Sequence, residues 1–461
     1  MPSIGFREAS YIKKYLSEVK HITLDPGGND VLRIHMIPPR SSHDHNTPCV
    51  IIVNGQDIVP ISLSWAILLS AFIDAITPFD GQELPERVWD KLIRTAILRV
   101  KRVYPTVKQD TLRSDLWTII SALTDVARGR KPQTDIGCLS LGEYAVHMKA
   151  PHRMDLMISA MTHNGAWNCN QRCLHCYAAG QPLSSADELS TSQWKAIIDK
   201  CKNAGIPQLT FTGGEPTLRS DLIELVEHSR WFITRLNTNG VLLTPQLCER
   251  LCKSSLDSVQ VTLYSADSQA HNRLVGANNW SYTVQGIKNA LNANLNVSIN
   301  TPLCTLNSNY VATLKLAHEL GVRFASCSGL IVTGGASGEE SIRTQLSSLE
   351  LFKILTQAQR FCTDNHMELS FTSPGWVCEN LLLEAGIYSA PSCGAALSNM
   401  AVTPDGQVIP CQSWLSDDAL GSMLTDDWSF MWDNPRCRQI RARSARMDKT
   451  CPLRPQSEVT L

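Results

Sequence analysis

The stretch Cys169-Asn170-Gln171-Arg172-Cys173-Leu174-His175-Cys176 places three cysteines in the order C-x3-C-x2-C. Iron–sulfur clusters are held by cysteine thiolates, and a cubic four-iron cluster normally takes four of them. Three thiolates without a close fourth can hold three irons and leave one iron open to a cofactor or substrate, as catalytic zinc sites keep an open position. The spacing therefore predicts a cluster with an open coordination site.

Zinc binding and chance burial are the competing interpretations of three nearby cysteines. Zinc ribbons usually place C-x2-C pairs in two separated knuckles, and the x3-x2 order differs from that pattern. The chain has 16 cysteines. A cytosolic chain keeps its thiols reduced and uses groups of them for metals or catalysis.

The composition is that of a globular protein with sizeable cores. The 461 residues are 43% hydrophobic and 18% charged, with a formal net charge of −1. This balance gives no electrostatic attraction to nucleic acid or to an anionic membrane. No apolar run approaches the ~20 residues that span a bilayer, and residues 1–7 lack a secretory signal pattern. We therefore expect a cytoplasmic protein without a nucleic-acid or membrane partner.

Three regions are predicted, at residues 1–150, 151–345 and 346–461. The first has two strands, at 31–38 and 49–53, followed by helices at 64–76, 86–103 and 110–128. The second alternates strands and helices, with strands at 155–161, 208–212, 233–238, 258–263, 297–300 and 323–332. Six such βα units imply parallel strands joined by right-handed crossovers. We therefore expect an α/β fold, a partial (β/α)6 TIM-like barrel.

Chemistry in such barrels sits at the carboxyl ends of the strands. The cysteine loop, the segment Gly213-Gly214-Glu215-Pro216 and the pair Asn239-Gly240 all follow predicted strands. Glycines allow a close backbone approach without a Cβ clash. The three segments are thus expected to meet at one end of the barrel.

The cysteine triplet followed by the GGEP loop resembles the radical S-adenosylmethionine (SAM) superfamily. The resemblance implies that Cys169, Cys173 and Cys176 hold a 4Fe-4S cluster whose open iron chelates the amino and carboxylate groups of SAM. An electron from the cluster then cleaves SAM to a 5′-deoxyadenosyl radical.

The same resemblance implies further contacts with SAM, although a capping or turn role is the alternative for each residue. Glu215 and its neighbours Gly213, Gly214 and Pro216 would meet the amino group. Thr238, Asn239 and Arg273 would support the carboxylate, with an Arg fork well suited to it. The remaining expected contacts are His175 beside the adenine, Thr262 on the fourth strand, Asn300 and Thr301 near the ribose, and Gly334-Gly335 on the adenine side.

The third region carries a second set of cysteines. Residues 402–411 indicate a β-hairpin with Asp405-Gly406 as its turn, which would bring Cys393 and Cys411 together. The C-x12-G-x4-C spacing resembles the SPASM and Twitch extensions of radical SAM enzymes, although the full SPASM cysteine pattern is absent. The resemblance implies one auxiliary 4Fe-4S cluster on Cys378, Cys393 and Cys411, with Cys451 or Cys437 as the fourth ligand. Four thiolates also suit zinc, which is the alternative.

The strand-then-helix order of the first region resembles the winged-helix-like domain that binds leader peptides in many peptide-modifying radical SAM enzymes. A helical cap or dimerisation domain is the alternative. The resemblance as a whole implies a radical SAM enzyme that modifies a precursor peptide and takes electrons from a donor such as flavodoxin or ferredoxin. The other readings are a radical SAM dehydrogenase or cofactor-maturation enzyme acting on a small molecule, and a non-catalytic iron–sulfur scaffold or electron carrier.

Overall fold

The chain packs as two compact units. The computed structural model describes residues 16–24, 32–38, 49–55, 57–79, 84–128, 130–134, 136–163, 165–416, 418–447 and 449–454. Unit 1 comprises Met1–His152 with Cys201–Pro207, and unit 2 comprises Arg153–Lys200 with Gln208–Leu461. Residues 1–7, which carry the prediction about a secretory signal, lie outside the described residues. Among the helices in the described ranges, none is both long and apolar enough to cross a lipid bilayer.

Unit 1 contains an antiparallel sheet followed by helices, the order that the sequence predicts. The strands lie in the order β1 (Lys20–Leu24), β2 (Leu32–Ile37), β3 (Cys49–Val53) and β4 (Asp57–Ile61). The sequence analysis missed β1 and β4. Pro60 made β4 difficult to predict, because a proline argues against a strand in the middle of a sheet. Strand β4 lies at an edge of the sheet, where a proline is tolerated.

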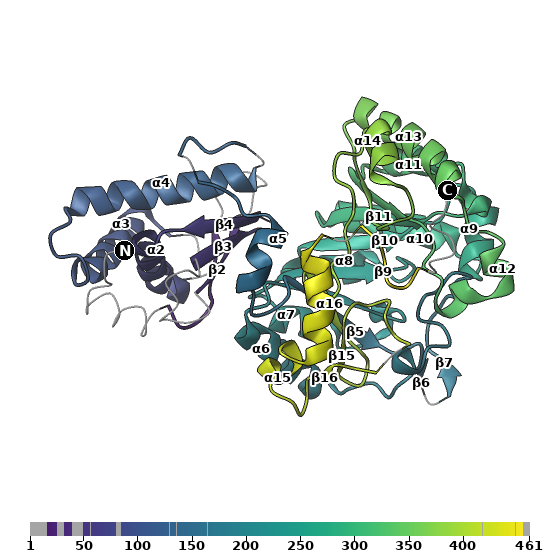
Figure 1. Cartoon of the computed structure of the whole chain (residues 1–461), viewed down its shortest axis with the longest axis horizontal. Helices are drawn as coiled ribbons and strands as arrows, with labels where there is room; N and C mark the ends of the chain where they lie inside the picture. Colours follow the sequence, from purple (N-terminus) through teal and green to yellow (C-terminus); the bar gives the residue numbers. More distant parts are fainter. Residues whose placement is uncertain are drawn as a thin grey trace. The chain divides into compact units, whose positions relative to one another are not determined.

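The helices of unit 1 pack on one another and against its sheet (Figure 1). They are α2 (Leu63–Ile76), α3 (Glu86–Lys101), α4 (Gln109–Ala127) and the short α5 (Leu141–Tyr144). Helix α2 is apolar over most of its surface and is buried between the others, whereas α3 buries one stripe that includes Leu92, Ala96 and Val100. Together with the strands of the sheet, these helices enclose one hydrophobic core.

Unit 2 is built on a ten-stranded sheet in the order β13-β12-β11-β10-β9-β8-β5-β14-β15-β16. The strands from β13 to β14 are parallel, and β15 and β16 are antiparallel. This order confirms the predicted partial barrel, with β5, β8, β9, β10, β11 and β12 as the six expected strands. The strand bounds are β5 (Arg153–Ser159), β8 (Gln208–Gly213), β9 (Ile233–Thr238), β10 (Ser258–Thr262), β11 (Asn296–Pro302), β12 (Phe324–Ser328), β13 (Glu368–Phe371), β14 (Asn399–Val402), β15 (Gln407–Ile409) and β16 (Gly421–Ser422).

Helices alternate with these strands along the chain (Figure 1). They are α6 (Thr191–Ala204), α7 (Leu222–His228), α8 (Pro245–Lys253), α9 (Ser268–Val275), α10 (Trp280–Asn292), α11 (Tyr310–Leu320), α12 (Glu339–Ile342), α13 (Ser348–Asp364), α14 (Glu379–Glu384), α15 (Trp428–Trp432) and α16 (Pro435–Ala445). The strands present an apolar, fully buried face to the helices, because every second residue, such as Phe211, Leu236 and Val261, is apolar.

Several features of unit 2 differ from the expected elements. The strand β13, which pairs in parallel with β12 at the edge of the sheet, was not predicted. A small hairpin of β6 (Thr162–His163) and β7 (Ala166–Trp167) separates β5 from the cysteine loop, where a direct connection was expected. The C-terminal hairpin is confirmed, but its first strand, β14, also pairs in parallel with β5. That pairing joins the C-terminal cysteine region to the main sheet. The region boundary predicted near residue 345 stays a prediction.

A glycine allows α10 to pack on the turn that follows β9. A Cβ atom at Gly286 would lie 2.0 Å from the carbonyl oxygen of Gly240. We expect Gly286→Ala to lower the free energy of unfolding by about 2 kcal/mol, because overpacking outweighs the better helix propensity of alanine. Urea unfolding measures this. Gly338→Ala is the matched control, since the nearest atom to its Cβ would be at an ordinary 3.4 Å. Equal stability of the two variants would contradict the packing argument.

Candidate active site

The three cysteines of the C-x3-C-x2-C motif lie together in the loop that follows β7. Each is partly buried, and Cys173 is close enough to Cys169 and Cys176 to respond to the charge of both. Burial raises the pKa of Cys169 to about 12 and raises the pKa of the other two thiols as well. The free thiols therefore hold their protons, which positively charged iron would displace on binding.

The end of α9 fixes the backbone of this loop. The N–H of Arg172 donates to the carbonyl of Val275 at 2.9 Å, and the N–H of Leu174 donates to that of Leu274 at 2.8 Å. Gly276 follows with a φ of 63°, and a Cβ there would lie 2.5 Å from the carbonyl oxygen of Arg172. The glycine thus permits the close contact that holds the cysteines in place.

Backbone N–H groups point at the sulfur atoms. The N–H of Gln171 lowers the pKa of Cys169, and the N–H of Ala178 does the same for Cys176, against the larger effect of burial. Such hydrogen bonds stabilise thiolates and tune iron–sulfur clusters. A cubane places each thiolate on a separate iron. Three thiols close enough to feel one another's charge fit such a cluster.

The carboxylate of Glu215 is buried and joins two loops. Its Oε1 accepts hydrogen bonds from the N–H and Oγ1 of Thr217 at 3.0 and 2.6 Å, and from Oγ1 of Thr238 at 2.7 Å. Its Oε2 accepts from the N–H of Asn239 at 2.8 Å. A carboxylate has about four acceptor positions, so protein groups take most of its capacity. Burial raises the pKa of Glu215, while these hydrogen bonds lower it.

The glycines before Glu215 serve packing within the protein. Gly213 has a φ of 137°, and a Cβ there would lie 2.2 Å from the carbonyl oxygen of Ser159. A Cβ at Gly214 would lie 2.8 Å from the carbonyl oxygen of Ala160. The N–H of Glu215 donates to Oγ of Ser159 at 3.1 Å. The close approach expected from the sequence is therefore made, at least in part, to the end of β5.

Asn239 joins the third strand end to the cysteine loop. Its Nδ2 donates to Oδ1 of Asn170 at 2.6 Å, and its Oδ1 accepts from the N–H of Val241 at 3.0 Å. Asn170 lies between the first two cysteines of the motif and was not among the predicted site residues. The x3 gap of the motif thus contains a residue that positions the loop.

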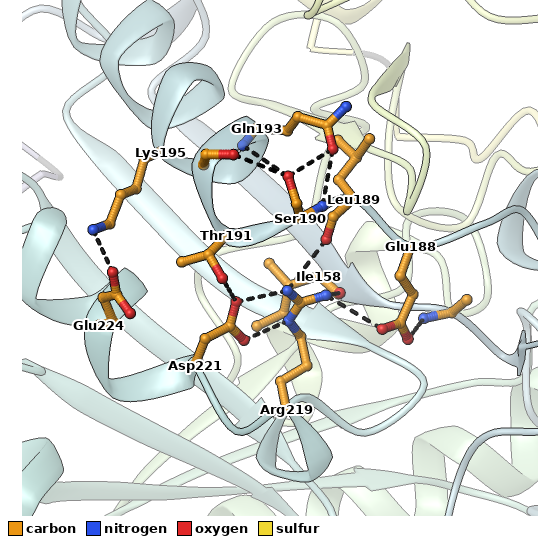
Figure 2. Close-up of polar contacts among 12 residues, drawn as sticks. Ile158, Glu188, Leu189, Ser190, Thr191, Gln193, Lys195, Arg219, Asp221 and Glu224 are labelled. Carbon is orange, nitrogen blue, oxygen red and sulfur yellow. Dashed lines mark hydrogen bonds and ion pairs between the residues drawn. The ribbon is translucent and has the colours of Figure 1, made fainter.

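Arg219, which follows the GGEP loop and is largely buried, is the centre of a polar network (Figure 2). Arg219 donates to Asp221 through Nε at 2.9 Å and Nη2 at 2.7 Å. It also donates to the carbonyls of Ile158 at 2.9 Å and Leu189 at 3.2 Å, and to Glu188 at 3.3 Å. Glu188 continues the network to β5 and to the residue before Cys169, accepting from the N–H of Ala160 at 2.9 Å and from Nδ2 of Asn168 at 2.8 Å.

His175 and Arg273 lie in different surroundings. His175 is buried, and its Nε2 lies 2.8 Å from Oγ1 of Thr344. Its pKa is lowered to about 4 by burial, so the ring is neutral at pH 7. The Arg273 side chain is 61% exposed and lies 3.4 Å from Glu340. The roles of both residues toward SAM stay predictions.

The other predicted contacts lie at or near strand ends. Thr262 and Asn300 are partners in the register of β10 and β11. Oδ1 of Asn300 accepts from Ser326 at 2.9 Å. Pro216 begins the short 3-10 turn Pro216–Leu218. Their contacts with SAM are likewise untested predictions.

The C-terminal cysteines form a second group. Cys411 is close enough to Cys393 and Cys451 for their charges to raise its pKa, in addition to burial. N–H groups of Ser413 and Leu453 point at Cys411 and Cys451, as at the first site. These three thiols therefore fit a second cluster.

The backbone before Cys378 packs near Cys451, whereas Cys437 has another contact. Cys378 itself is exposed, and its role as a ligand stays a prediction. A Cβ at Gly375 would lie 3.1 Å from the carbonyl oxygen of Lys449, so the segment before Cys378 packs on the segment before Cys451. Cys437 is fully buried, and Arg441 donates to its sulfur at 3.5 Å. These contacts favour Cys451 over Cys437 as the fourth ligand.

Comparison with known proteins identifies two domains. Residues 168–317 match the radical SAM superfamily, and residues 393–453 match the iron–sulfur cluster-binding domain named SPASM. The chain therefore contains a radical SAM domain and a SPASM domain. Its cofactors are accordingly SAM and 4Fe-4S clusters.

Proteins similar to this chain are named for different functions. An AdoMet-dependent heme synthase of Methanosarcina barkeri is 33% identical over 38% of this chain, and the match spans 50% of that protein's length. A PqqA peptide cyclase of Granulibacter bethesdensis is 24% identical over 59% of this chain and 72% of its own length. SuiB of Streptococcus suis, solved with its precursor peptide SuiA, has a TM-score of 0.57 at 15% identity and covers 86% of this chain and 87% of its own.

Arg219 is expected to stabilise unit 2 strongly. Replacing it with Met leaves the largely buried Glu188 and Asp221 without their cation, which should cost about 3 kcal/mol of unfolding free energy. Chemical denaturation checks this. Arg250→Met, on an exposed site of α8, is the control and should change stability by less than about 0.5 kcal/mol. Unfolding of both variants at the same denaturant concentration would show that the network contributes little.

The auxiliary ligand set can be tested by iron content. Cys411→Ala and Cys451→Ala should each bind roughly four irons fewer per chain than the wild type, because an incomplete thiolate set loses the cluster. Cys437→Ala should keep the wild-type content. Iron analysis and Mössbauer spectroscopy after anaerobic reconstitution measure both. Loss of iron in Cys437→Ala together with retention in Cys451→Ala would instead identify Cys437 as the fourth ligand.

Proposed function

We propose that this radical SAM enzyme modifies a ribosomally synthesised precursor peptide, by forming a crosslink or otherwise functionalising a Cα or Cβ carbon. The bound cluster and SAM supply a 5′-deoxyadenosyl radical that abstracts hydrogen. The protein holds these groups at the carboxyl ends of the strands, through the thiols of Cys169, Cys173 and Cys176. The observation that carries the proposal is the junction of the cysteine loop, the GGEP loop and the end of β9 through Glu215 and Asn239.

The N-terminal unit supports a peptide as the substrate. Residues 153–461 are 309 of the 461 residues, about two thirds, whereas the match to SuiB covers 86% of the chain. The similarity in fold therefore extends into unit 1. In that unit β1 and β4 lie at the sheet edges. An edge strand is what an extended peptide pairs with when it adds a strand to a sheet.

A small-molecule reaction is the second candidate. It is favoured by the similarity to the heme synthase. That match has a higher identity (33%) than the match to the PqqA peptide cyclase (24%), but it extends over only 177 residues. A match of that length covers the shared core without the parts that select a substrate. For either substrate we infer an electron donor such as flavodoxin or ferredoxin and a location in the cytoplasm.

Radical initiation is tested by SAM cleavage. Anaerobically reconstituted enzyme with SAM and dithionite should form 5′-deoxyadenosine. The triple variant Cys169→Ala/Cys173→Ala/Cys176→Ala should form less than about one hundredth as much, since it lacks the thiolates that hold the cluster. Chromatography with mass detection measures the product. A wild-type enzyme with full iron content that forms no 5′-deoxyadenosine would overturn the proposal.

Deletion of the N-terminal region distinguishes a peptide substrate from a small molecule. A variant that lacks residues 1–150 removes the predicted peptide-recognition region. Under the peptide proposal, full-length enzyme should bind short peptides encoded beside its gene, and fluorescence anisotropy should show weaker binding after the deletion. Binding that is absent for the full-length enzyme, or unchanged by the deletion, would favour a small molecule.

A further inference from the structure

The face of the main sheet opposite the buried apolar face is polar. Side chains alternate along each strand, so the residues between the buried apolar ones share this second face. On β9 these are Arg235 and Asn237, and on the flanking strands they include Thr210 and Gln260. Arg235 is paired in register with Thr210 on one side and Ser258 on the other. A charged guanidinium therefore lies in the middle of this polar face.

Arg235 belongs to a group of three charges with an unequal balance. Arg153 lies 2.9 Å from Asp155, whose side chain is 1% exposed, and donates a second contact to it at 3.3 Å. Both of these charges lie close enough to Arg235 to change its pKa. Asp155 is thus neutralised by Arg153, and Arg235 leaves the group with one positive charge in excess. The backbone of Arg235 is paired in the sheet, but its side chain makes no hydrogen bond and no ion pair with a described residue.

Two neighbouring polar atoms also lack partners. Oγ1 of Thr210 and Oδ1 of Asn237 are buried, and neither has a hydrogen bond within the described ranges. Thr210 is only 2% exposed. Buried polar atoms in folded proteins normally have partners. A guanidinium and a hydroxyl would donate to an anion, while a free amide oxygen would accept from an N–H group.

The position of this group limits the ligand that could reach it. Arg235 precedes Thr238, at the carboxyl end of β9, by three residues. At a rise of about 3.3 Å per residue the two positions are about 10 Å apart. A molecule bound beside the loops after β8 and β9 would have to extend about 10 Å along the polar face of the sheet to contact the guanidinium of Arg235.

We propose that Arg235, with Thr210, is a specificity-determining site for a carboxylate of the substrate, and that Asn237 accepts an N–H next to it. The inference rests on the proposed function, since a peptide supplies both groups. The carboxylate is an acidic side chain or the C-terminus of the peptide, held about 10 Å from the SAM-binding loops. A guanidinium fork pairs with a carboxylate through two parallel hydrogen bonds.

An unpaired charge at this place should cost stability until a ligand arrives. Burial and the charge of Arg153 lower the pKa of Arg235, although an arginine stays protonated in proteins. Removing the charge should therefore stabilise the ligand-free protein, as often happens when a functional group is deleted. An arginine with a purely structural role would show the opposite effect.

The experiment compares melting temperatures of wild type, Arg235→Gln and Arg235→Lys, reconstituted and without SAM. Arg235→Gln should melt about 2 °C or more above the wild type. Millimolar acetyl-alanyl-aspartyl amide and acetyl-alanyl-alanine carry a side-chain and a terminal carboxylate, and acetyl-alanyl-asparaginyl amide is the neutral probe. At least one acidic probe should raise the melting temperature of the wild type by about 2 °C. Arg235→Lys should retain a smaller shift, and Arg235→Gln none.

The outcomes separate the possibilities. The acidic probe with the larger shift identifies the source of the carboxylate. Arg323→Gln, at an exposed position before β12, is the matched control and should respond as the wild type does. A lower melting temperature for Arg235→Gln, or equal shifts in Arg235→Gln and wild type, overturns the inference. Because the assay contains no SAM, its result is independent of whether the enzyme cleaves SAM.

Discussion

The buried carboxylate of Glu215 is the contact on which the geometry of the site depends. It binds N–H and hydroxyl groups from its own loop and from the end of β9, while its backbone N–H binds the end of β5. Burial of a carboxylate is costly unless its acceptor positions are filled, and here four hydrogen bonds fill them. Asn239 then carries the connection to Asn170 in the cysteine loop. Glu215 thus links the loops that follow β5, β8 and β9, whose strands are already paired in the sheet.

The network around Arg219 also consists of buried polar groups that satisfy one another, but its main members are charged. A buried ion pair repays its desolvation only when the remaining donors and acceptors are also satisfied. Arg219 meets this condition with two carboxylates and two carbonyls (Figure 2). Glu188 meets it by also accepting from Ala160 and Asn168. Arg235 shows the contrasting case of a charge whose protein partners are incomplete. The first arrangement stabilises the scaffold, and the second is available to a ligand.

The two cysteine groups are connected through Tyr177. This residue follows Cys176 directly and is partly buried. Burial raises its pKa, and it is near enough to Cys176, Asp155 and Cys411 for their charges to raise it further. The pairing of β14 with β5 brings this about, because it fixes the C-terminal hairpin beside the first strand of the barrel. An auxiliary cluster on the C-terminal cysteines would thus be separated from the first cluster by packed side chains within one compact unit.

Local patterns in the sequence predicted the six parallel strands of the barrel, most of its helices and the cysteine loop. They did so because alternation, helical periodicity and motif spacing act over a few residues. Such short-range patterns did not predict the edge strand β4, the pairing of β14 with β5 or the partners of Arg219. Ile158 and Glu188 lie 61 and 31 residues from Arg219, so no short-range pattern marks their contact. Glu215 was predicted as a site residue, but its role in joining the loops was not. Only the tertiary structure decided that role, because a buried carboxylate takes whichever donors the folded chain places around it.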